Sequence, residues 1–446
     1  MVLKTFSFGG VHPADNKLSA GKPIEILPVP QMVSIPLSQH LGAPSEPVVN
    51  KGDTVKTGQL IAKSTGFVSA NIHSSVSGKV EKIDEVLDAS GYRRKAIIIK
   101  TEGDEWEPSI DRSDKLIKEI KLSSEEIIKR ISDAGIVGMG GATFPSHVKL
   151  SPPPGKKCEI LIINGVECEP YLTSDHRLML EKSEEMLVGI TLLMKALNVD
   201  KAIIGIENNK KDAIEKLQNL VHSYTGISVQ PLKVKYPQGG EKQLIDACIK
   251  RYVPSGKLPI EVGAVVHNVG TAFAVYEAVQ KNKPLFERVV TVTGISVKNP
   301  VNLLVRIGTP VSALLEAAGG MPENCAKIVN GGPMMGKALS SSEVPITKGS
   351  SGILLLPLEL TEKQEMQNCI RCGKCASTCP MKLSPYLLMS LGERQIWDRA
   401  EEEHVFDCIE CGSCVYVCPS YRPLLDYVRI GKSEVMKIIR ARAAAK

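Results

Sequence analysis

The chain carries the stretch CIRCGKCASTCP at residues 369–380 and repeats its pattern as CIECGSCVYVCP at residues 408–419. Both stretches have the spacing C-x2-C-x2-C-x3-C-P, which is typical of the bacterial ferredoxin runs whose thiolates ligate [4Fe–4S] clusters. Where a chain has two such runs, the fourth cysteine of each usually ligates the cluster of the other run. The sequence therefore predicts two clusters near the C-terminus and one-electron transfer as their chemistry.

The exchange of the fourth cysteine defines two ligand sets. One predicted cluster takes Cys369, Cys372, Cys375 and Cys418, and the other takes Cys408, Cys411, Cys414 and Cys379. Disulfides or two zinc sites are the alternatives, but they use other cysteine spacings. The four remaining cysteines are scattered along the chain (Cys158, Cys168, Cys248 and Cys325). This usage indicates a reducing compartment and not a disulfide-rich secreted protein.

Length and composition set the outer bounds of the prediction. With 446 residues, 43% of them hydrophobic, we expect about two to four globular domains. The formal net charge of +6 is a mild excess that does not by itself indicate nucleic-acid binding. The N-terminal MVLKTFSFGG lacks the apolar core of a signal peptide, and no uninterrupted apolar run is long enough to cross a membrane. Any membrane association is therefore expected to come through partners.

The N-terminal third is predicted to hold an arm and a small β module. Residues 1–30, rich in Gly and Pro, are expected to form an extended arm, whose His12 has no second metal ligand nearby. In residues 31–103, KGDTVKTGQLIA at 51–62 followed by SGKV at 77–80 resembles a barrel-sandwich hybrid, the fold of biotinyl and lipoyl carriers. The hairpin where carriers present their lysine, residues 64–71, has none, although Lys63 is close. We expect a structural or docking module, with a covalent cofactor as the alternative.

Residues 104–283 alternate between helix and strand patterns after a linker with a short amphipathic helix at 114–121. A helix is predicted from Ser124, with a capping start and a stop at Gly135. Further strands are expected within 158–170, 201–207, 234–240 and 264–270, and helices at 175–197, 210–221 and 241–252. This alternation predicts a wound, mainly parallel, Rossmann-like sheet.

The remaining two parts are predicted to be a β-grasp module and a helical domain. Residues 284–350 combine strands, one helix and a hairpin, and resemble the soluble-ligand-binding β-grasp (SLBB) domain. Residues 351–446 hold the cysteine runs and a basic C-terminal helix with Lys432, Lys437, Arg440, Arg442 and Lys446. We expect this helix to end in solvent, with docking to an acidic partner or to anionic lipid as the alternative.

A glycine loop and three polar strand ends predict a nucleotide site. The loop VGMGGATFP places Gly138, Gly140 and Gly141 ahead of Lys149, so backbone amides and a cation can approach a phosphate. It is not the Walker A pattern, because it lacks G-K-[ST], and it is not G-x-G-x-x-G, because position 143 is Thr. The strand ends carry Asn164, Glu167 and Glu169, then Tyr236, Gly239 and Glu241, and finally Asn268 and Thr271. Wound sheets bind ligands at the carboxyl ends of their strands, so we expect one shared crevice.

These phrases resemble a known family. GMGGATFP with Lys149, N-x-x-E-x-E-P, Y-x-x-G-x-E and N-V-x-T are similar to the flavin- and NADH-binding subunit of respiratory complex I and related hydrogenases. With the barrel-sandwich hybrid, the SLBB-like module and the twin cysteine runs, nearly the whole chain resembles the C subunits of Rnf electron-transport complexes. Two departures from the complex I pattern are Thr143 and Gly240, and the complex I protein has a single C-x2-C-x2-C motif.

The resemblance implies a set of cofactor contacts. A noncovalent FMN would be surrounded by Gly138, Gly140, Lys149, Asn164, Glu167, Tyr236, Gly239, Glu241, Asn268 and Thr271. Phe144, Glu169 and Lys149 would face the nicotinamide nucleotide. No catalytic acid or base is expected, because hydride passes directly between the two cofactors. A flavin is also what two clusters and a nucleotide site require, since it converts hydride into single electrons.

The family resemblance implies a peripheral NAD(H)-binding subunit of an ion-translocating ferredoxin:NAD+ oxidoreductase at the cytoplasmic face of the membrane. Its expected partners are the membrane and cluster-bearing subunits of that complex, and ferredoxin indirectly. One alternative is a cobalamin reductase of metabolosome type with the same layout. Another is a cluster-bearing electron relay whose nucleotide site is vestigial.

Overall fold

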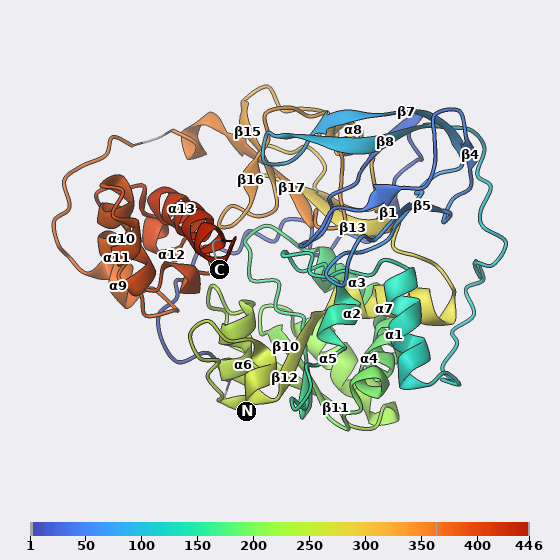
Figure 1. The fold of residues 1–446 in the computed structure, drawn as a ribbon, viewed down its shortest axis with the longest axis horizontal. Coiled ribbons are helices and arrows are strands. Elements are labelled where there is room, and N and C mark those ends of the chain that lie inside the picture. Colours follow the sequence, from blue (N-terminus) through green and yellow to red (C-terminus); the bar gives the residue numbers. More distant parts are fainter. Residues whose placement is uncertain (1–2, 363, 445–446) are drawn as a thin grey trace.

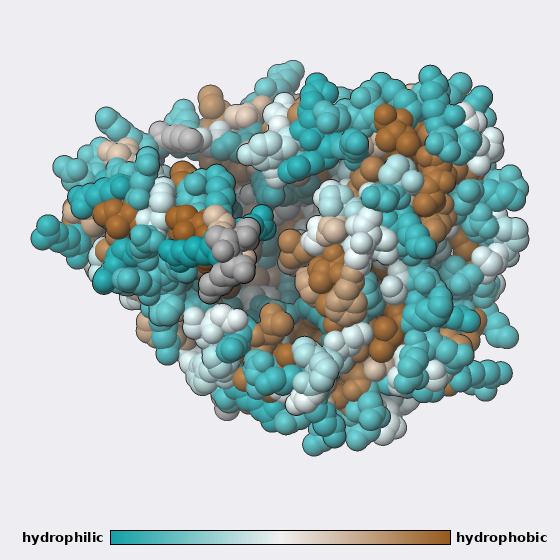
Figure 2. Space-filling view, in the orientation of Figure 1, coloured by the Kyte–Doolittle hydropathy of each residue, from teal (hydrophilic) through white to brown (hydrophobic). Residues whose placement is uncertain are grey.

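The computed structural model describes residues 3–362 and 364–444. Figure 1 shows the antiparallel sheets of β4, β5, β7 and β8 at the upper right, the parallel sheet with its helices below them, and the C-terminal helices as a separate lobe at the left. Most of the face in Figure 2 is polar, and a recess lies between this helical lobe and the sheets.

Two small antiparallel sheets form the module predicted at residues 31–103. One sheet has the order β2-β8-β7-β4 and the other β3-β5-β6. Ile35, Ile61 and Ile97 are among the fully buried side chains of their common core. The strands are β2 (Met32–Pro36), β3 (Glu46–Pro47), β4 (Thr54–Val55), β5 (Leu60–Lys63), β6 (Ile72–His73), β7 (Gly78–Leu87) and β8 (Arg93–Thr101). Lys63 is exposed at the end of β5.

A parallel sheet with the order β11-β10-β9-β12 forms the centre of the chain. Successive side chains of a strand point to opposite faces, so Leu161 and Ile163 of β9 join one core and Ile162 joins another. Helices α1, α4, α5 and α7 contribute to the first core and α6 to the second. The strands are β9 (Ile160–Asn164), β10 (Ala202–Glu207), β11 (Ile227–Leu232) and β12 (Ala264–Asn268). The predicted wound, parallel sheet is confirmed.

The helices of this part are α1 (Ser124–Asp133), α2 (Ser146–Lys149), α3 (Ser174–Glu181), α4 (Ser183–Leu197), α5 (Lys211–Leu220), α6 (Glu241–Ile249) and α7 (Val269–Gln280). The predicted start of α1 is a complete capping box: Ser123 accepts from the Glu126 amide and the Glu126 carboxylate accepts from the Ser123 amide. No helix in the described ranges has the length and apolar character that a membrane span needs.

A six-stranded mixed sheet, β1-β14-β13-β17-β15-β16, forms the predicted β-grasp part together with α8 (Val311–Ala317). Its first strand comes from the N-terminal arm, because β1 pairs in parallel with β14. The strands are β1 (Ile24–Ile26), β13 (Glu287–Thr293), β14 (Val301–Arg306), β15 (Cys325–Asn330), β16 (Lys337–Ala338) and β17 (Gly352–Pro357). The arm is therefore partly a strand.

The helical lobe consists of α9 (Lys374–Ser377), α10 (Pro385–Glu393), α11 (Trp397–Glu402), α12 (Ser413–Tyr416) and α13 (Leu424–Ala444). Leu388, Val428 and Val435 are part of its own apolar core. Several charges of the predicted basic helix are paired: Arg442 contacts Asp398 and Glu401 of α11, each at 2.9 Å. Lys446 lies outside the described residues.

Three expectations about local elements are wrong. The single helix expected at 175–197 is divided into α3 and α4 at Lys182, whose φ of −125° and ψ of 36° are not helical. Residues 114–121 form no helix; Tyr276 and Gln280 of α7 satisfy the backbone of Ile117 instead. The strand expected at 234–240 lies earlier, as β11. The domain limits read from the sequence stay predictions.

Helices α4 and α7 approach closely at Gly189, where a Cβ atom would lie 1.9 Å from the Ala272 carbonyl oxygen. We predict that Gly189→Val forces the helices apart and lowers the stability of the sheet domain by about 3 kcal/mol, as overpacking does. Thermal unfolding followed by circular dichroism measures the loss. Gly66→Ala is the control, because nothing lies within 4 Å of the added Cβ atom there; an equal loss in both variants would contradict the prediction.

Candidate functional site

The predicted strand ends meet at one edge of the parallel sheet. Asn164 at the end of β9 is the register partner of Asn268 at the end of β12. Strand β10 pairs with the other side of β9, so the strand order reverses between β9 and β12. Such a reversal is where wound sheets open a crevice for a ligand.

Two loops complete the crevice. The Asn164 side-chain amide donates to the Gly239 carbonyl at 2.8 Å, which holds the loop after β11 against β9. Gly140 of the glycine loop lies over Asn268, because a Cβ atom at Gly140 would be 3.2 Å from the Asn268 Cβ atom. The structure therefore brings the glycine loop and all three strand ends together, as the sequence predicts.

The glycine loop is held by its own backbone and by α7. Val137 and Pro145 form an antiparallel bridge, and the Gly138 amide donates to the Phe144 carbonyl at 2.8 Å. The buried Thr271 hydroxyl accepts from the Met139 amide at 2.9 Å. Thr271 of α7 thus fixes the backbone of the loop. Gly141 forms the exposed tip of the loop and has open space around it.

Two helices begin at the crevice. Asn268 caps α7, accepting from the amides of Gly270 and Thr271. The Glu167 carboxylate accepts from the Asp175 and His176 amides at the start of α3, at 2.8 and 3.2 Å. These amides therefore already have side-chain acceptors. The open position is Gly141, where a phosphate-bearing cofactor such as FMN can approach the backbone of the glycine loop.

Lys149 and Glu241 form an ion pair beside this edge. The Lys149 ammonium lies 2.6 Å from a Glu241 carboxylate oxygen and also donates to the Val266 carbonyl at 3.0 Å. Glu241 is the first residue of α6, where its negative charge is favourable. Besides Glu167, these two are the charged side chains that the sequence predicts around FMN, and the ion pair fixes both.

Two predicted nucleotide contacts bind other parts of the chain, Tyr236 the helical lobe and Glu169 the β-grasp part. The Tyr236 hydroxyl donates to the Cys411 carbonyl at 2.8 Å and is buried. The Glu169 carboxylate accepts from the Met334 and Met335 amides, at 3.1 and 2.8 Å, in the loop after β15. Burial raises the pKa of Glu169 to about 7. Their contacts with FMN and nicotinamide stay predictions.

Two buried charged residues were missed from the sequence. Asp175 accepts from the Asn268 side-chain amide at 2.7 Å, and burial together with Glu167 raises its pKa to about 7. Lys17 of the arm donates to the carbonyls of Glu167, Glu169 and Leu172 at 2.9, 2.9 and 2.6 Å. Burial and the charge of Lys210 lower its pKa to about 8. No local sequence pattern marks Asp175 or Lys17, because the partners of both lie far away in the chain.

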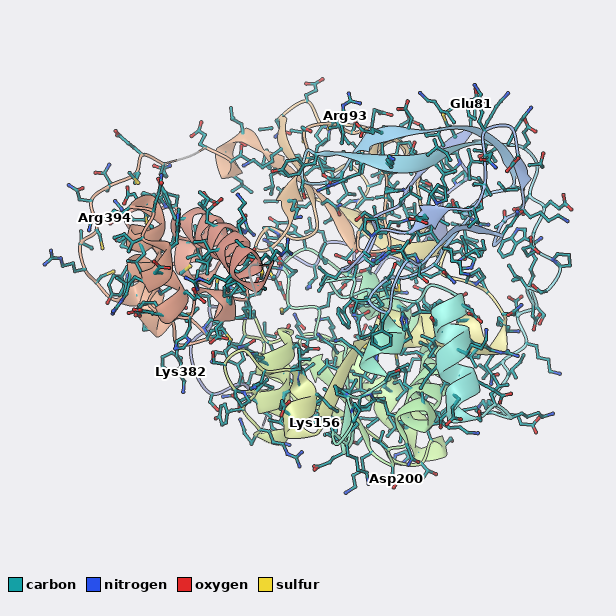
Figure 3. The ribbon with its side chains drawn as sticks, in the orientation of Figure 1. Glu81, Arg93, Lys156, Asp200, Lys382 and Arg394 are labelled. Atoms are coloured by element: carbon teal, nitrogen blue, oxygen red, sulfur yellow. The ribbon has the colours of Figure 1, made fainter. Side chains whose placement is uncertain are left out.

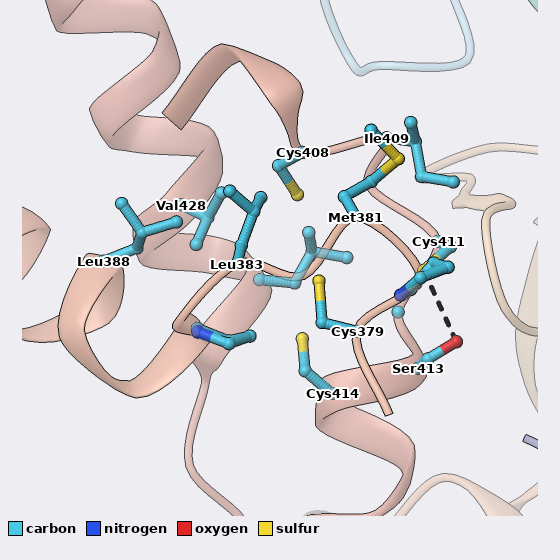
Figure 4. A pocket seen from close by; sticks show the side chains of 14 residues that line it. Cys379, Met381, Leu383, Leu388, Cys408, Ile409, Cys411, Ser413, Cys414 and Val428 are labelled. Atoms are coloured by element: carbon cyan, nitrogen blue, oxygen red, sulfur yellow. Dashed lines mark hydrogen bonds between the residues drawn. The ribbon is translucent and has the colours of Figure 1, made fainter. Parts of the chain in front are cut away.

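One complete predicted ligand set lines a single cavity. Cys379, Cys408, Cys411 and Cys414 surround a hollow of about 410 Å³, counting the part open to solvent, in the helical lobe (Figure 4). Leu383, Leu388 and Val428 supply apolar walls. The Glu410 amide donates to the Cys408 sulfur at 3.4 Å, the type of contact that tunes a cluster potential. We call this hollow the inner cluster site, and its lining of four thiols fits a [4Fe–4S] cluster.

The other ligand set is less enclosed. Cys369 and Cys372 are exposed ahead of α9, and Cys375 and Cys418 are half-buried. Burial raises the pKa of the Cys375 thiol, and Cys418 is near enough to add to the shift. The two runs fold alike, because Gly373 and Gly412 precede α9 and α12 with φ of 74° and 75°. This repeat is consistent with a second, outer cluster site.

Within the described residues, no three His, Cys, Asp or Glu side chains are close enough to bind one metal ion directly. A cubane distributes its four thiolates over four irons. Its ligands therefore lie farther apart than those of a single ion.

Family models match the chain in four consecutive parts. They are the RnfC Barrel sandwich hybrid domain at residues 4–104, the Nuo51 FMN-binding domain at 131–277, the SLBB domain at 289–338 and the 4Fe-4S dicluster domain at 362–419. The predicted fold class is confirmed, and FMN and [4Fe–4S] clusters are the cofactors of the matched domains. The identity of each ligating residue stays a prediction.

Named relatives cover most of the chain. It is 51% identical to the C subunit of the proton-translocating ferredoxin:NAD(+) oxidoreductase complex of Clostridium ljungdahlii, over 97% of this chain and 94% of the relative. It is 45% identical to the Na(+)-translocating counterpart of Acetobacterium woodii, over 96% of each chain. It is 42% identical to the C subunit of the ion-translocating oxidoreductase complex of Rhodobacter capsulatus, over 86% of this chain and 75% of the relative.

We predict that Cys411→Ala removes one cluster and leaves the other, so iron falls from about eight to about four atoms per chain, since each cubane holds four. Iron analysis of anaerobically purified protein measures this. Cys168→Ala is the matched control, because Cys168 also packs beside Tyr236 but is outside both cysteine runs. Retention of eight irons by the Cys411 variant would contradict the ligand assignment.

Asp175 gives a pH-dependent prediction. Its pKa is raised in the folded chain, so its contribution to stability is present below the ordinary Asp pKa and is lost as the pH rises toward 7. Asp175→Asn keeps an oxygen that accepts from Asn268. Because Asn does not ionise, the variant does not lose stability as the pH rises. We expect the variant to be more stable than the wild type by about 1–2 kcal/mol at pH 8, with the gain shrinking toward pH 5.

Thermal or urea unfolding across this pH range measures the difference. The exposed Asp133→Asn is the control. A gain for Asp175→Asn that does not change with pH would show that the carboxylate is not the cause.

Proposed function

The chain belongs to the family of C subunits of ion-translocating ferredoxin:NAD+ oxidoreductase (Rnf) complexes, and from this premise we propose that it exchanges electrons with NAD(H) and relays them through its two clusters. It is an oxidoreductase subunit with an FMN-binding domain and a dicluster domain. The observation that carries the proposal is the hydrogen bond from the Tyr236 hydroxyl to the Cys411 carbonyl, because it joins the crevice loop to the inner cluster site.

The residues at the crevice would hold the flavin in a fixed position. The glycine loop, which contains Gly138 and Gly140, leaves open space for its phosphate at the tip, Gly141, and the Lys149–Glu241 pair lies beside this edge of the sheet. Asn164, Glu167, Gly239, Asn268 and Thr271 determine the shape of the crevice through the contacts described above. When bound, FMN converts the hydride of NADH into single electrons.

Phe144 and Glu169 would face the nicotinamide nucleotide. Phe144 is half-buried at the end of the glycine loop, and its carbonyl closes that loop. Glu169 is held at the junction of the crevice, the β-grasp part and the inner cluster site by two backbone amides. A carboxylate fixed by backbone donors can orient a bound nucleotide without acting as an acid or base.

The inner cluster site would receive electrons first. Cys411 contacts Tyr236 directly, whereas Cys369 and Cys372 lie on the exposed side of the lobe. Electrons would then reach the outer cluster and leave toward other subunits of the complex. Ferredoxin is an indirect partner in this scheme, and the protein would bind at the cytoplasmic face of the membrane.

The relatives are named for either proton or Na+ translocation, and ion movement in this scheme belongs to other subunits. The names of the relatives do not support a cobalamin reductase. A vestigial nucleotide site is not favoured either, because the glycine loop and the strand ends remain assembled around Asn164 and Asn268.

Anaerobic purification followed by FMN and iron analysis tests the proposal. We expect about one FMN and eight irons per chain, and NADH should bleach the flavin and generate cluster signals in electron paramagnetic resonance (EPR). A protein that holds eight irons and takes up no FMN would contradict it.

Lys149→Ala is predicted to slow NADH-dependent flavin reduction on the order of tenfold or more, because a positioned cation near the crevice is lost. Iron content should not change. Lys156→Ala is the matched control: Lys156 belongs to the same domain, pairs with Glu261 and lies at its outer surface (Figure 3). Iron loss in the Lys149 variant would assign Lys149 to folding instead.

A further inference from the structure

We propose that residues 4–17 of the N-terminal arm, here called the strap, are a positioning element that sets the distance between the flavin crevice and the inner cluster site. Figure 1 shows this segment passing between the helical lobe and the parallel-sheet part. The inference rests on the proposed function, because it concerns the electron step between the two sites.

Three consecutive residues of the strap contact both sides of the gap. Val11 forms an antiparallel bridge with Tyr236, with two backbone hydrogen bonds of 2.8 Å. Next to it, the Gly10 amide donates to the Thr378 carbonyl at 2.8 Å, and the Thr378 hydroxyl donates back to the Gly10 carbonyl at 2.8 Å. Thr378 immediately precedes Cys379. The backbone of the crevice loop and that of the cluster run are therefore tied to one short peptide.

Gly9 shows how closely the strap approaches the cluster run. A Cβ atom at Gly9 would lie 2.7 Å from the Thr378 carbonyl oxygen and 2.8 Å from the Cys379 carbonyl carbon. Gly9 also has a φ of 72°, which residues with a Cβ atom rarely adopt. Backbone packs directly on backbone here, so any larger residue must push the lobe away.

The strap is anchored on both sides of this contact. Toward the N-terminus, Phe6 is buried beneath Lys235, and the Ser7 amide donates to Asp246 of α6 at 2.6 Å. Toward the C-terminus, Lys17 donates to three carbonyls of the segment that follows β9. A segment fixed at both ends can transmit a constraint, whereas a loose tail cannot.

The other polar contacts between the lobe and the parallel-sheet part are longer, except for Tyr236–Cys411. Among the described residues, Gln243 donates to the Pro380 carbonyl at 3.5 Å and to the Met381 sulfur at 3.3 Å, and the Gly256 amide donates to Asp407 at 3.2 Å. Lys242 is 4.0 Å from Asp407. The strap thus supplies most of the short hydrogen bonds that hold the lobe against the crevice.

The strap meets the crevice residues at Val11 and Lys17, whereas the atoms nearest to an added Cβ atom at Gly9 all belong to the cluster run. A change at Gly9 should therefore leave hydride transfer from NADH in place. Electron transfer across the gap should slow, because its rate falls steeply with distance. Loosening the strap should therefore separate two steps that the intact chain couples: the flavin is still reduced, but the clusters are reduced late.

Gly9→Val tests this in the full-length protein purified with both cofactors. After mixing with NADH, flavin bleaching at wild-type rate is expected by stopped flow. Cluster reduction, followed by rapid-freeze EPR, should slow on the order of tenfold or more, as small displacements of reacting groups do. The midpoint potentials of the clusters should not change. An unchanged potential would show that the variant moves the lobe away from the crevice and does not alter the cluster itself.

Gly21→Val is the matched control, because Gly21 belongs to the same arm, lies outside the strap and has nothing within 4 Å of an added Cβ atom. If Gly9→Val lowers the iron content, Thr378→Val replaces it, since this change removes only the hydroxyl bond to Gly10. Cluster reduction at wild-type rate in the iron-replete variant would overturn the strap proposal. Failure of NADH to reduce the flavin in the wild type would instead overturn the proposed function.

Discussion

The hydrogen bond from the Tyr236 hydroxyl to the Cys411 carbonyl is the contact on which the functional architecture depends. It crosses from the parallel-sheet part to the helical lobe within an apolar cluster that includes Val11, Cys168 and Met334. An unpaired hydroxyl in such surroundings would be costly, so the bond favours one placement of the lobe. That placement brings the predicted cluster ligand Cys411 next to the loop that helps to form the crevice.

Buried charge surrounds the same junction. Lys17, Glu169 and Asp175 all have shifted pKa values because they are removed from water, yet backbone groups or an amide partner bind each of them. Buried charged groups need such partners, and the partners come from segments far apart in the chain. The network therefore favours one arrangement of arm, sheet, β-grasp part and lobe, at some cost in stability at neutral pH.

Local features were predicted well where neighbouring residues decide them. The capping box of α1, for example, needs only Ser123 and Glu126. Residues 114–121 have a suitable pattern for the expected helix. Their backbone at Ile117 instead forms hydrogen bonds with the side chains of Tyr276 and Gln280 of α7. The break at Lys182 is likewise unmarked, because Ser183 is compatible with a helix interior.

By itself, the sequence determined the two cysteine runs, the alternation that makes the wound sheet, and the glycine loop with its polar strand ends. The spacing of residues in the sequence is enough to predict these features, because each is formed by residues that are close together in the chain. Only the tertiary structure decided that Tyr236 bonds to the lobe and Glu169 to the β-grasp part, that Lys17 supports the crevice, and that Gly9 packs on the cluster run. These contacts join residues more than a hundred positions apart, and no local pattern encodes which distant backbone a side chain will meet.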